Sequence, residues 1–240
     1  ENTILVCLDP HGKDMSSEVL ASKIDSWTNL ARQQDSHHTD SDHKKIGRKP
    51  AIILSSYPGK PWQIAHAVGL DGLASAEAIL ADNGFTNRPE VPLANSLPEA
   101  QITWPVDAYL SALDRLPETL RQAVFGAWGE VDTDPHVWAG AFHFTAEWRG
   151  DALVAVQPER SEPKLKKDSY HDLARTPPHH YVAFYLWLSR HSGCDCMVHI
   201  GAHGTLEWLP GKAVALSGTC WPEVLAGQMA VIYPFIVDDP

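Results

Sequence analysis

The sequence predicts an α/β fold in which mostly parallel sheet units are flanked by helices and a β-hairpin is added. The apolar run Ala51–Ser55 is typical of a buried strand, and residues 73–83 follow it with helical spacing. A strand, a loop and a helix in this order indicate a β-α unit. Two alternating runs, Ala141–Trp148 and Ala152–Gln157, flank Arg149-Gly150-Asp151, which indicates the hairpin.

Three units are predicted along the chain. Residues 1–45 hold a strand-helix segment, with the helix over residues 16–32, and a polar linker. Residues 46–125 form an α/β unit. Residues 126–240 form a second α/β unit that contains the hairpin and the loop HGTLEWLPGK, residues 203–212.

Other elements follow from local patterns. Ile4–Leu8 is a short apolar run and predicts a strand. Val106–Leu116 and Glu118–Phe125 predict two helices separated by Pro117, whereas the prolines of Pro89–Pro98 predict irregular structure.

The helix with the clearest signals spans Pro178–Ser192, since prolines open it and Gly193 ends it. Four residues at helical spacing predict one apolar stripe: Tyr181, Phe184, Tyr185 and Leu188. His180 is expected on the surface. Cys194–Ile200 then predicts a short buried strand.

Composition narrows the class of protein. Hydrophobic residues make up 44% of the 240 residues and charged residues 20%, which is typical of a globular chain. The net charge of −11 argues against a nucleic-acid partner, and no apolar run is long enough for a membrane span. The four cysteines show no disulfide framework, so we expect a cytoplasmic location. The start at Glu1 suggests a piece of a longer protein.

The stretch after the last predicted strand carries the chemistry. His199, His203 and Glu207 offer two imidazoles and a carboxylate, which bind transition metals or move protons. Gly201 and Gly204 end the strand and allow a turn with φ above zero, before a short helix over residues 206–209. Ligand crevices form at such strand ends. An equally good interpretation is a glycine turn with a core histidine and a surface glutamate, because no HExxH pattern is present.

The sequence of this stretch resembles the family of cobaltochelatase large subunits, which magnesium chelatase H subunits share in a looser form. The matching residues of the motif are His199, Gly201, His203, Gly204, Thr205, Glu207, Trp208, Leu209, Pro210, Gly211 and Lys212. Further matches are Tyr57-Pro58, Gly69-Leu70-Asp71, Ser75, Gln157-Pro158, Arg160, Tyr170-His171-Asp172, Pro178-His179, Tyr181, Ala183, Phe184, Tyr185, Trp187, Leu216-Ser217, Cys220, Pro222 and Tyr233–Val237.

The resemblance implies insertion of Co²⁺, as substrate, into the tetrapyrrole hydrogenobyrinic acid a,c-diamide, driven by ATP with Mg²⁺. Because GxxxxGK[ST] is absent from the sequence, ATP is expected on separate AAA+ ATPase partner subunits. Cobalt is preferred to magnesium because imidazole suits cobalt better. Glu207 and His203 are then the catalytic candidates. The metal candidates are His203, His199, Glu207 and His171.

Candidates for tetrapyrrole binding are Lys212, Arg160, His179 and Tyr57. The family has glycine after the arginine of Q-P-x-R, where this chain has Ser161, and this difference puts the placement of Arg160 in question. Three alternatives stay open: a non-catalytic tetrapyrrole- or metal-binding module, a magnesium chelatase H-type subunit, and a metal-dependent hydrolase.

Overall fold

The computed structural model describes residues 4–8, 49–56, 70–85, 91–160, 172–201, 206–212 and 217–235, with the backbone alone for 4–8, 207, 234 and 235. Within these residues the strands are β1 (Ile4–Leu8), β2 (Pro50–Leu54), β3 (Gln101–Pro105), β4 (Val137–Trp138), β5 (Ala141–Arg149), β6 (Ala152–Val156), β7 (Cys196–Ile200) and β8 (Ala230–Phe235). The helices are α2 (Gly72–Asp82), α3 (Leu93–Ser96), α4 (Val106–Leu113), α5 (Glu118–Trp128), α6 (His179–Arg190) and α7 (Trp221–Ala226), with 3₁₀ turns η1 (Leu97–Glu99), η2 (Val131–Thr133) and η4 (Leu206–Trp208).

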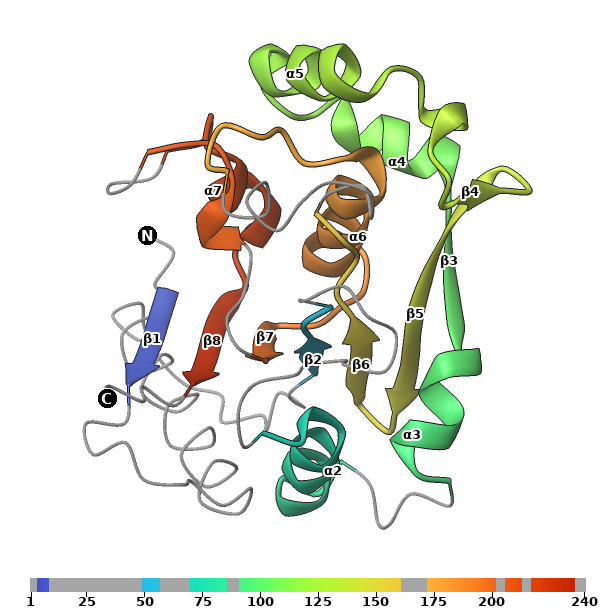
Figure 1. Ribbon diagram of the computed structural model, residues 1–240, viewed down its shortest axis with the longest axis vertical. Coiled ribbons are helices and arrows are strands. Elements are labelled where there is room, and N and C mark those ends of the chain that lie inside the picture. The colour runs from blue at the N-terminus through green and yellow to red at the C-terminus, as the bar shows by residue number, and fades with distance from the viewer. Residues whose placement is uncertain are drawn as a thin grey trace, which may run out of the picture.

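One sheet joins these strands in the order β1-β8-β7-β2-β6-β5-β3, and β4 pairs with β5 beside this path. The strands from β1 to β6 in this order are parallel to their neighbours. β5 runs antiparallel to β6, β3 and β4. Figure 1 shows β1 and β3 at opposite edges of the sheet. The predicted α/β fold with a mostly parallel sheet and an added hairpin is therefore confirmed.

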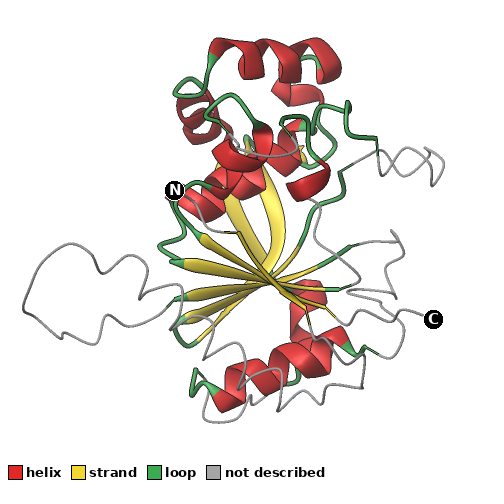
Figure 2. Ribbon diagram, turned by 90° about the vertical axis from the view of Figure 1, so that its left-hand side faces the viewer, coloured by secondary structure: helices red, strands yellow, loops and turns green. Residues whose placement is uncertain are grey.

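Helices cover both faces of the sheet, so the fold has three layers (Figure 2). The alternation of β2 shows why: Ala51 and Ile53 belong to the core cluster that includes residues of α4, α5, α6 and α7, whereas Ile52 and Leu54 belong to the cluster that includes residues of α2 and α3. All four side chains are fully buried. A strand buried on both faces needs an apolar residue at every position, which is the pattern of Ala51–Leu54.

The helix α6 is buried on all sides rather than along one stripe. Residues 179–188 are all buried, because α6 lies between the sheet and the helices α4 and α7. The prediction that His180 lies on the surface is therefore wrong, since only 7% of this residue is exposed. The predicted helix itself is confirmed.

The sequence predictions for most other elements are confirmed. β1, α2, α4 and α5 lie where strands and helices were expected, and Asp71 caps α2 by accepting a hydrogen bond from the Ala74 N–H at 3.0 Å. The prediction of irregular structure over Pro89–Pro98 is wrong in part, because α3 and the start of η1 fall inside it. The predicted helix over residues 16–32 and the linker lie outside the described residues. The three-unit division stays a prediction.

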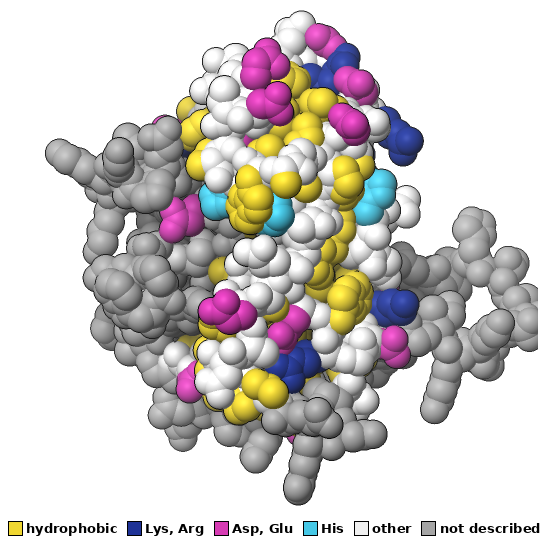
Figure 3. Space-filling model, turned by 90° about the vertical axis from the view of Figure 1, so that its right-hand side faces the viewer, with side chains coloured by type: hydrophobic (Ala, Val, Ile, Leu, Met, Phe, Trp, Pro, Cys, Tyr) yellow, Lys and Arg dark blue, Asp and Glu magenta, His cyan; other side chains and the backbone are white. Residues whose placement is uncertain are grey.

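The antiparallel side of the sheet differs from the parallel part. β3 forms its edge, and large aromatic side chains near it remain exposed: Trp138 to 46% and Trp148 to 43%. The Trp138 ring stacks on His143 with centroids 3.4 Å apart. Figure 3 views this side and shows hydrophobic, acidic and histidine side chains interspersed on it. The helices that bury the parallel strands thus leave part of this side open to solvent.

The tip of the hairpin yields a stability prediction. Gly150 has φ 59°, and a Cβ there would overlap the backbone carbonyl of Phe85. We expect Gly150→Ala to lower the free energy of unfolding by about 1–3 kcal/mol, because both the strain and the overlap must be relieved. Thermal unfolding measures the change.

The matched control is Gly126→Ala in α5, where φ is not positive and a Cβ has open space. There the same change should raise stability by about 0.5–1 kcal/mol, since alanine is the better helix former. Equal effects at the two positions would contradict the assigned hairpin geometry.

Candidate functional site

The carboxyl ends of the parallel strands form one edge of the sheet. β6 runs into Gln157, β7 ends in His199 and Ile200, and their alignment continues past the strand ends. The Gln157 N–H donates to the Leu54 carbonyl at 2.8 Å, and the Ser55 N–H donates to the Ile200 carbonyl at 2.9 Å. Gly201 follows with φ 146°, the positive value expected for the end of this strand. Ligands of open α/β sheets bind outside this edge.

His199 lies on β7 and points to the α6 side of the sheet, between two tyrosine rings. Its ring centroid is 4.9 Å from that of Tyr233 and 6.2 Å from that of Tyr185, with planes inclined by 24° and 18°. Only 2% of His199 is exposed, and among the described residues neither ring nitrogen has a hydrogen-bond partner. Burial lowers the pKa of His199 to about 3. The ring is therefore a neutral imidazole near pH 7, with one N–H and one lone pair.

Gln157 ties the end of β6 to α6. Its Nε2 donates to the hydroxyl oxygen of Tyr185 at 2.7 Å and to that of Tyr181 at 3.4 Å. Burial, and then the neighbouring tyrosines, raise the pKa of Tyr185 well above its usual value, so the phenol stays neutral. The strand end, the helix and the ring beside His199 are thus held in one arrangement.

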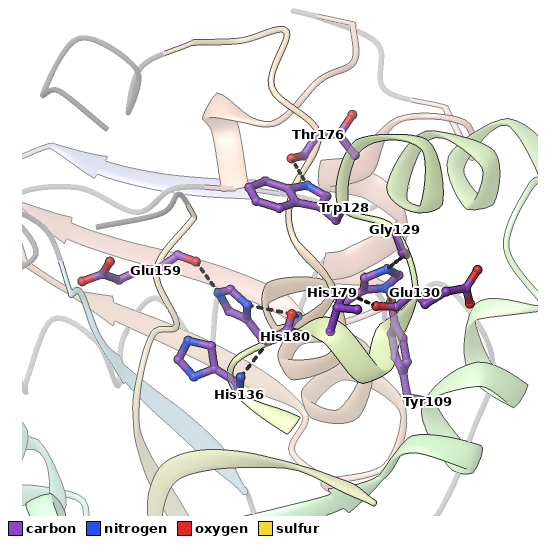
Figure 4. Close-up of polar contacts among 11 residues, drawn as sticks. Tyr109, Trp128, Gly129, Glu130, His136, Glu159, Thr176, His179 and His180 are labelled. Atoms are coloured by element: carbon purple, nitrogen blue, oxygen red, sulfur yellow. Dashed lines mark hydrogen bonds and ion pairs between the residues drawn. The ribbon is translucent and has the colours of Figure 1, made fainter. Parts of the chain in front are cut away.

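A second polar group lies at the first turn of α6 (Figure 4). Nδ1 of His180 is 3.0 Å from Oδ2 of Asp134, and Nε2 is 2.9 Å from the Glu159 carbonyl oxygen. Burial alone would raise the pKa of Asp134, but hydrogen bonds and the charge of His180 outweigh it and lower this pKa. The His180–Asp134 pair joins α6 to the residue that follows η2, and the contact with Glu159 joins α6 to the exit of β6.

His179 has a different, neutral network beside it (Figure 4). Its Nε2–H donates to the Gly129 carbonyl at 3.0 Å, and its Nδ1 accepts from the Tyr109 hydroxyl at 2.8 Å. Burial is the main cause of the lowered pKa of His179, and burial together with Asp134 raises that of Tyr109. Both ring nitrogens are engaged inside the protein, and the predicted role of His179 in substrate binding stays a prediction.

Three further candidate residues, Arg160, Glu207 and Lys212, have different surroundings in the structure. Arg160 is 1% exposed, and its Nη2 donates to the Asp172 carbonyl. Glu207 lies in η4, which confirms the predicted helical turn, although only its backbone is described. Lys212 is exposed, and its backbone N–H donates to Sγ of Cys220 at 3.4 Å. The functional roles predicted for these residues are untested by this geometry.

The remaining candidates, His171, His203 and Tyr57, lie outside the described residues. Within the described ranges no group of three or more histidine, cysteine, aspartate or glutamate side chains is placed to hold a metal ion. Convergence of His171, His199, His203 and Glu207 therefore stays a prediction. Of these four, His199 is the one whose side chain is described.

The comparisons with known proteins agree with one another. The family model described as CobN/Magnesium Chelatase matches residues 11–240. The aerobic cobaltochelatase subunit CobN of Sinorhizobium sp is 35% identical over 234 residues, which are 90% of this chain and 18% of that protein. The subunit of the same name from Pseudomonas aeruginosa is 34% identical over 254 residues, covering 95% of this chain and 19% of that protein. The chain thus spans less than a fifth of the length of these relatives.

The H subunit of magnesium chelatase from Chlorobaculum parvum is 37% identical over 91 residues, or 38% of this chain and 7% of that protein. The solved structure of the catalytic subunit of cobaltochelatase from Mycobacterium tuberculosis matches with a TM-score of 0.64 and 32% identity. This match covers 80% of this chain and 18% of that one. Among the helices that the structure places, none has the length and apolar character that crossing a membrane demands.

The buried imidazole yields a prediction about acid. The pKa of His199 is about 3 in the fold and about 6.5 in the unfolded chain, so only the unfolded state binds the proton between these values. The contribution of His199 to the free energy of unfolding therefore falls by about 1.4 kcal/mol per pH unit as the pH drops from 6.5 to 3. In His199→Phe this loss should be absent, which urea unfolding at several pH values measures.

Tyr233→Phe is the matched control, because it keeps a ring stacked on position 199 and leaves the imidazole in place. It should retain the wild-type slope. The same slope in His199→Phe as in the wild type would show that the imidazole takes up a proton in the folded state.

Proposed function

The chain belongs to the CobN and magnesium chelatase family, and from this premise we propose that it is a segment of the large, tetrapyrrole-binding subunit of an ATP-dependent cobaltochelatase. The substrates would be Co²⁺ and hydrogenobyrinic acid a,c-diamide. The observation that carries this proposal is the motif from His199 to Lys212, which starts at the carboxyl edge of the sheet. Cobalt is favoured over magnesium because the cobaltochelatase subunits align with almost the whole chain and the magnesium-chelatase subunit with a shorter part of it.

Metal insertion needs two kinds of group. The macrocycle must give up inner N–H hydrogen as a proton, and the divalent ion must exchange its waters for weak ligands. We assign Glu207 and His203 to the proton transfer, and His203, His199, Glu207 and His171 to transient metal binding. Imidazole is a good ligand for cobalt. The neutral state of His199 supports its assignment, because a ring without the second proton keeps one lone pair available near pH 7.

Substrate binding and energy supply are assigned to other groups. Lys212, Arg160, His179 and Tyr57 are proposed to bind the tetrapyrrole, and the exposed position of Lys212 suits contact with a carboxylated side chain. The nucleotide would be hydrolysed by AAA+ ATPase partner subunits, since the sequence has no P-loop. The cytoplasm is the proposed site of the reaction.

The proposed dependence of metal insertion on ATPase partner subunits can be tested. We expect the 240-residue chain alone to show no insertion with hydrogenobyrinic acid a,c-diamide, Co²⁺ and ATP, because it carries no nucleotide motif. Absorbance of the metallated tetrapyrrole measures turnover. The complete subunit with its ATPase partners should show turnover under the same conditions. Insertion by the isolated chain would contradict the proposal that ATP is hydrolysed on partner subunits.

The role assigned to Glu207 predicts an effect on the chemical step. In the complete subunit with its ATPase partners, Glu207→Gln should lower kcat by about 10²- to 10⁴-fold, the usual contribution of a positioned proton-transfer group. Tetrapyrrole affinity and melting temperature should stay near the wild-type values, because glutamine has nearly the same shape. Insertion assays measure kcat, binding titrations measure the tetrapyrrole affinity, and thermal unfolding measures the melting temperature.

Lys212→Ala is the contrasting variant. It should weaken tetrapyrrole binding and leave kcat near normal, because Lys212 is assigned to binding alone. A near-normal rate for Glu207→Gln would remove Glu207 from the chemistry. A lower melting temperature with unchanged kcat would make it a structural residue of the glycine loop.

A further inference from the structure

The ring of His180 lies between two hydrogen-bond acceptors. Nδ1 contacts the carboxylate of Asp134 at 3.0 Å, and Nε2 contacts the backbone carbonyl of Glu159 at 2.9 Å. Because neither oxygen can donate, both ring nitrogens must carry hydrogen. A ring that donates both hydrogen bonds at once is an imidazolium, and here it belongs to a residue that is only 7% exposed.

Asp134 supplies the balancing charge. Its Oδ2 accepts from the backbone N–H of His180 at 3.0 Å as well as from the ring, and its Oδ1 accepts from the N–H of His136 at 2.9 Å. The His136 ring stacks on His180 with centroids 4.1 Å apart. The carboxylate is thus bound to the first turn of α6 by backbone and side chain together. Such charge-assisted hydrogen bonds are about twice as strong as neutral ones.

On its other side, the ring of His180 holds the chain that leaves β6. The Glu159 carbonyl accepts a hydrogen bond from Nε2, and the next residue is Arg160, whose buried guanidinium donates to the Asp172 carbonyl. Asp172 directly follows His171, one of the residues assigned to transient metal binding. A chain of contacts therefore runs from Asp134 through His180 and Glu159 to Arg160 and Asp172.

We propose that His180 is a positioning residue for tetrapyrrole binding: by holding the Glu159 carbonyl between β6 and α6, it fixes Arg160 and, through Arg160, the backbone at Asp172. The inference rests on the proposed function, because the tetrapyrrole is the ligand expected at this edge of the sheet. His180 itself contacts neither the macrocycle nor the metal. It acts through Arg160.

Two amide variants separate the contacts of the ring. The amide nitrogen of asparagine can stand near the place of Nδ1, so His180→Asn keeps a donor toward Asp134 and loses the one toward Glu159. The longer His180→Gln can place its amide near Nε2 and retain a donor toward Glu159. His136→Asn is the matched control, because the His136 ring takes no part in the hydrogen bonds to Asp134 and Glu159.

The experiment uses the complete subunit, with hydrogenobyrinic acid a,c-diamide as the probe. His180→Asn should raise its dissociation constant about tenfold, the usual effect of a lost charge-assisted hydrogen bond, with kcat retained. Amide hydrogen exchange at Gln157, Glu159 and Arg160 should become faster while exchange in α6 stays slow. His180→Gln should show a smaller change in both quantities, and His136→Asn none.

A double-mutant cycle with Arg160→Lys tests whether His180 acts through Arg160. In the Arg160→Lys background, His180→Asn should raise the dissociation constant by less than about threefold. Full additivity, normal affinity of His180→Asn, or faster exchange along the whole of α6 would each overturn the inference. If the wild-type subunit binds no tetrapyrrole, the proposed function fails, whereas wild-type binding that survives His180→Asn defeats this inference alone.

Discussion

The burial of α6 is the constraint on which the rest of the structure depends. Residues 179–188 are shielded on every side, between the sheet and the helices α4 and α7. A polar group placed there must find a partner, since an unpaired buried donor or acceptor costs about 1–3 kcal/mol. His179 meets this requirement with Tyr109 and Gly129, and His180 meets it with Asp134 and Glu159. The hydrogen bonds of His179 to Gly129 and of His180 to Glu159 hold the loop before η2 and the exit of β6 in place.

Three buried histidines show how neighbouring groups decide the hydrogen bonding and charge of an imidazole ring. His199 lies between tyrosine rings, and burial depresses its pKa to about 3. His179 accepts from a phenol and donates to a carbonyl, which suits a neutral ring. His180 has a carboxylate and a carbonyl beside it, so both of its ring nitrogens face acceptors. Burial favours the neutral form of a histidine, whereas a neighbouring carboxylate favours the charged form.

Sequence patterns predicted the elements whose signal is local. Ala51–Leu54 is apolar at each position and became β2, and the Arg149-Gly150-Asp151 turn joins β5 to β6 as expected. The surface position predicted for His180 was wrong, because helical spacing assigns one apolar face and says nothing about packing on the others. Its partner Asp134 stands 46 residues earlier, and nothing in the chain between them marks the pair. The doublet His179-His180 at a helix start was the one available signal.

The state of His199 also separates the roles within the proposed site. Insertion of a metal ion displaces inner N–H hydrogen of the macrocycle as a proton, so the site needs an acceptor that takes up a proton near neutral pH. A ring whose pKa is about 3 does not take up a proton there, although its lone pair remains available to a metal ion. Under the proposed function, His199 is therefore suited to metal binding and unsuited to proton transfer. The protons are left to Glu207 and His203, the two residues assigned to proton transfer.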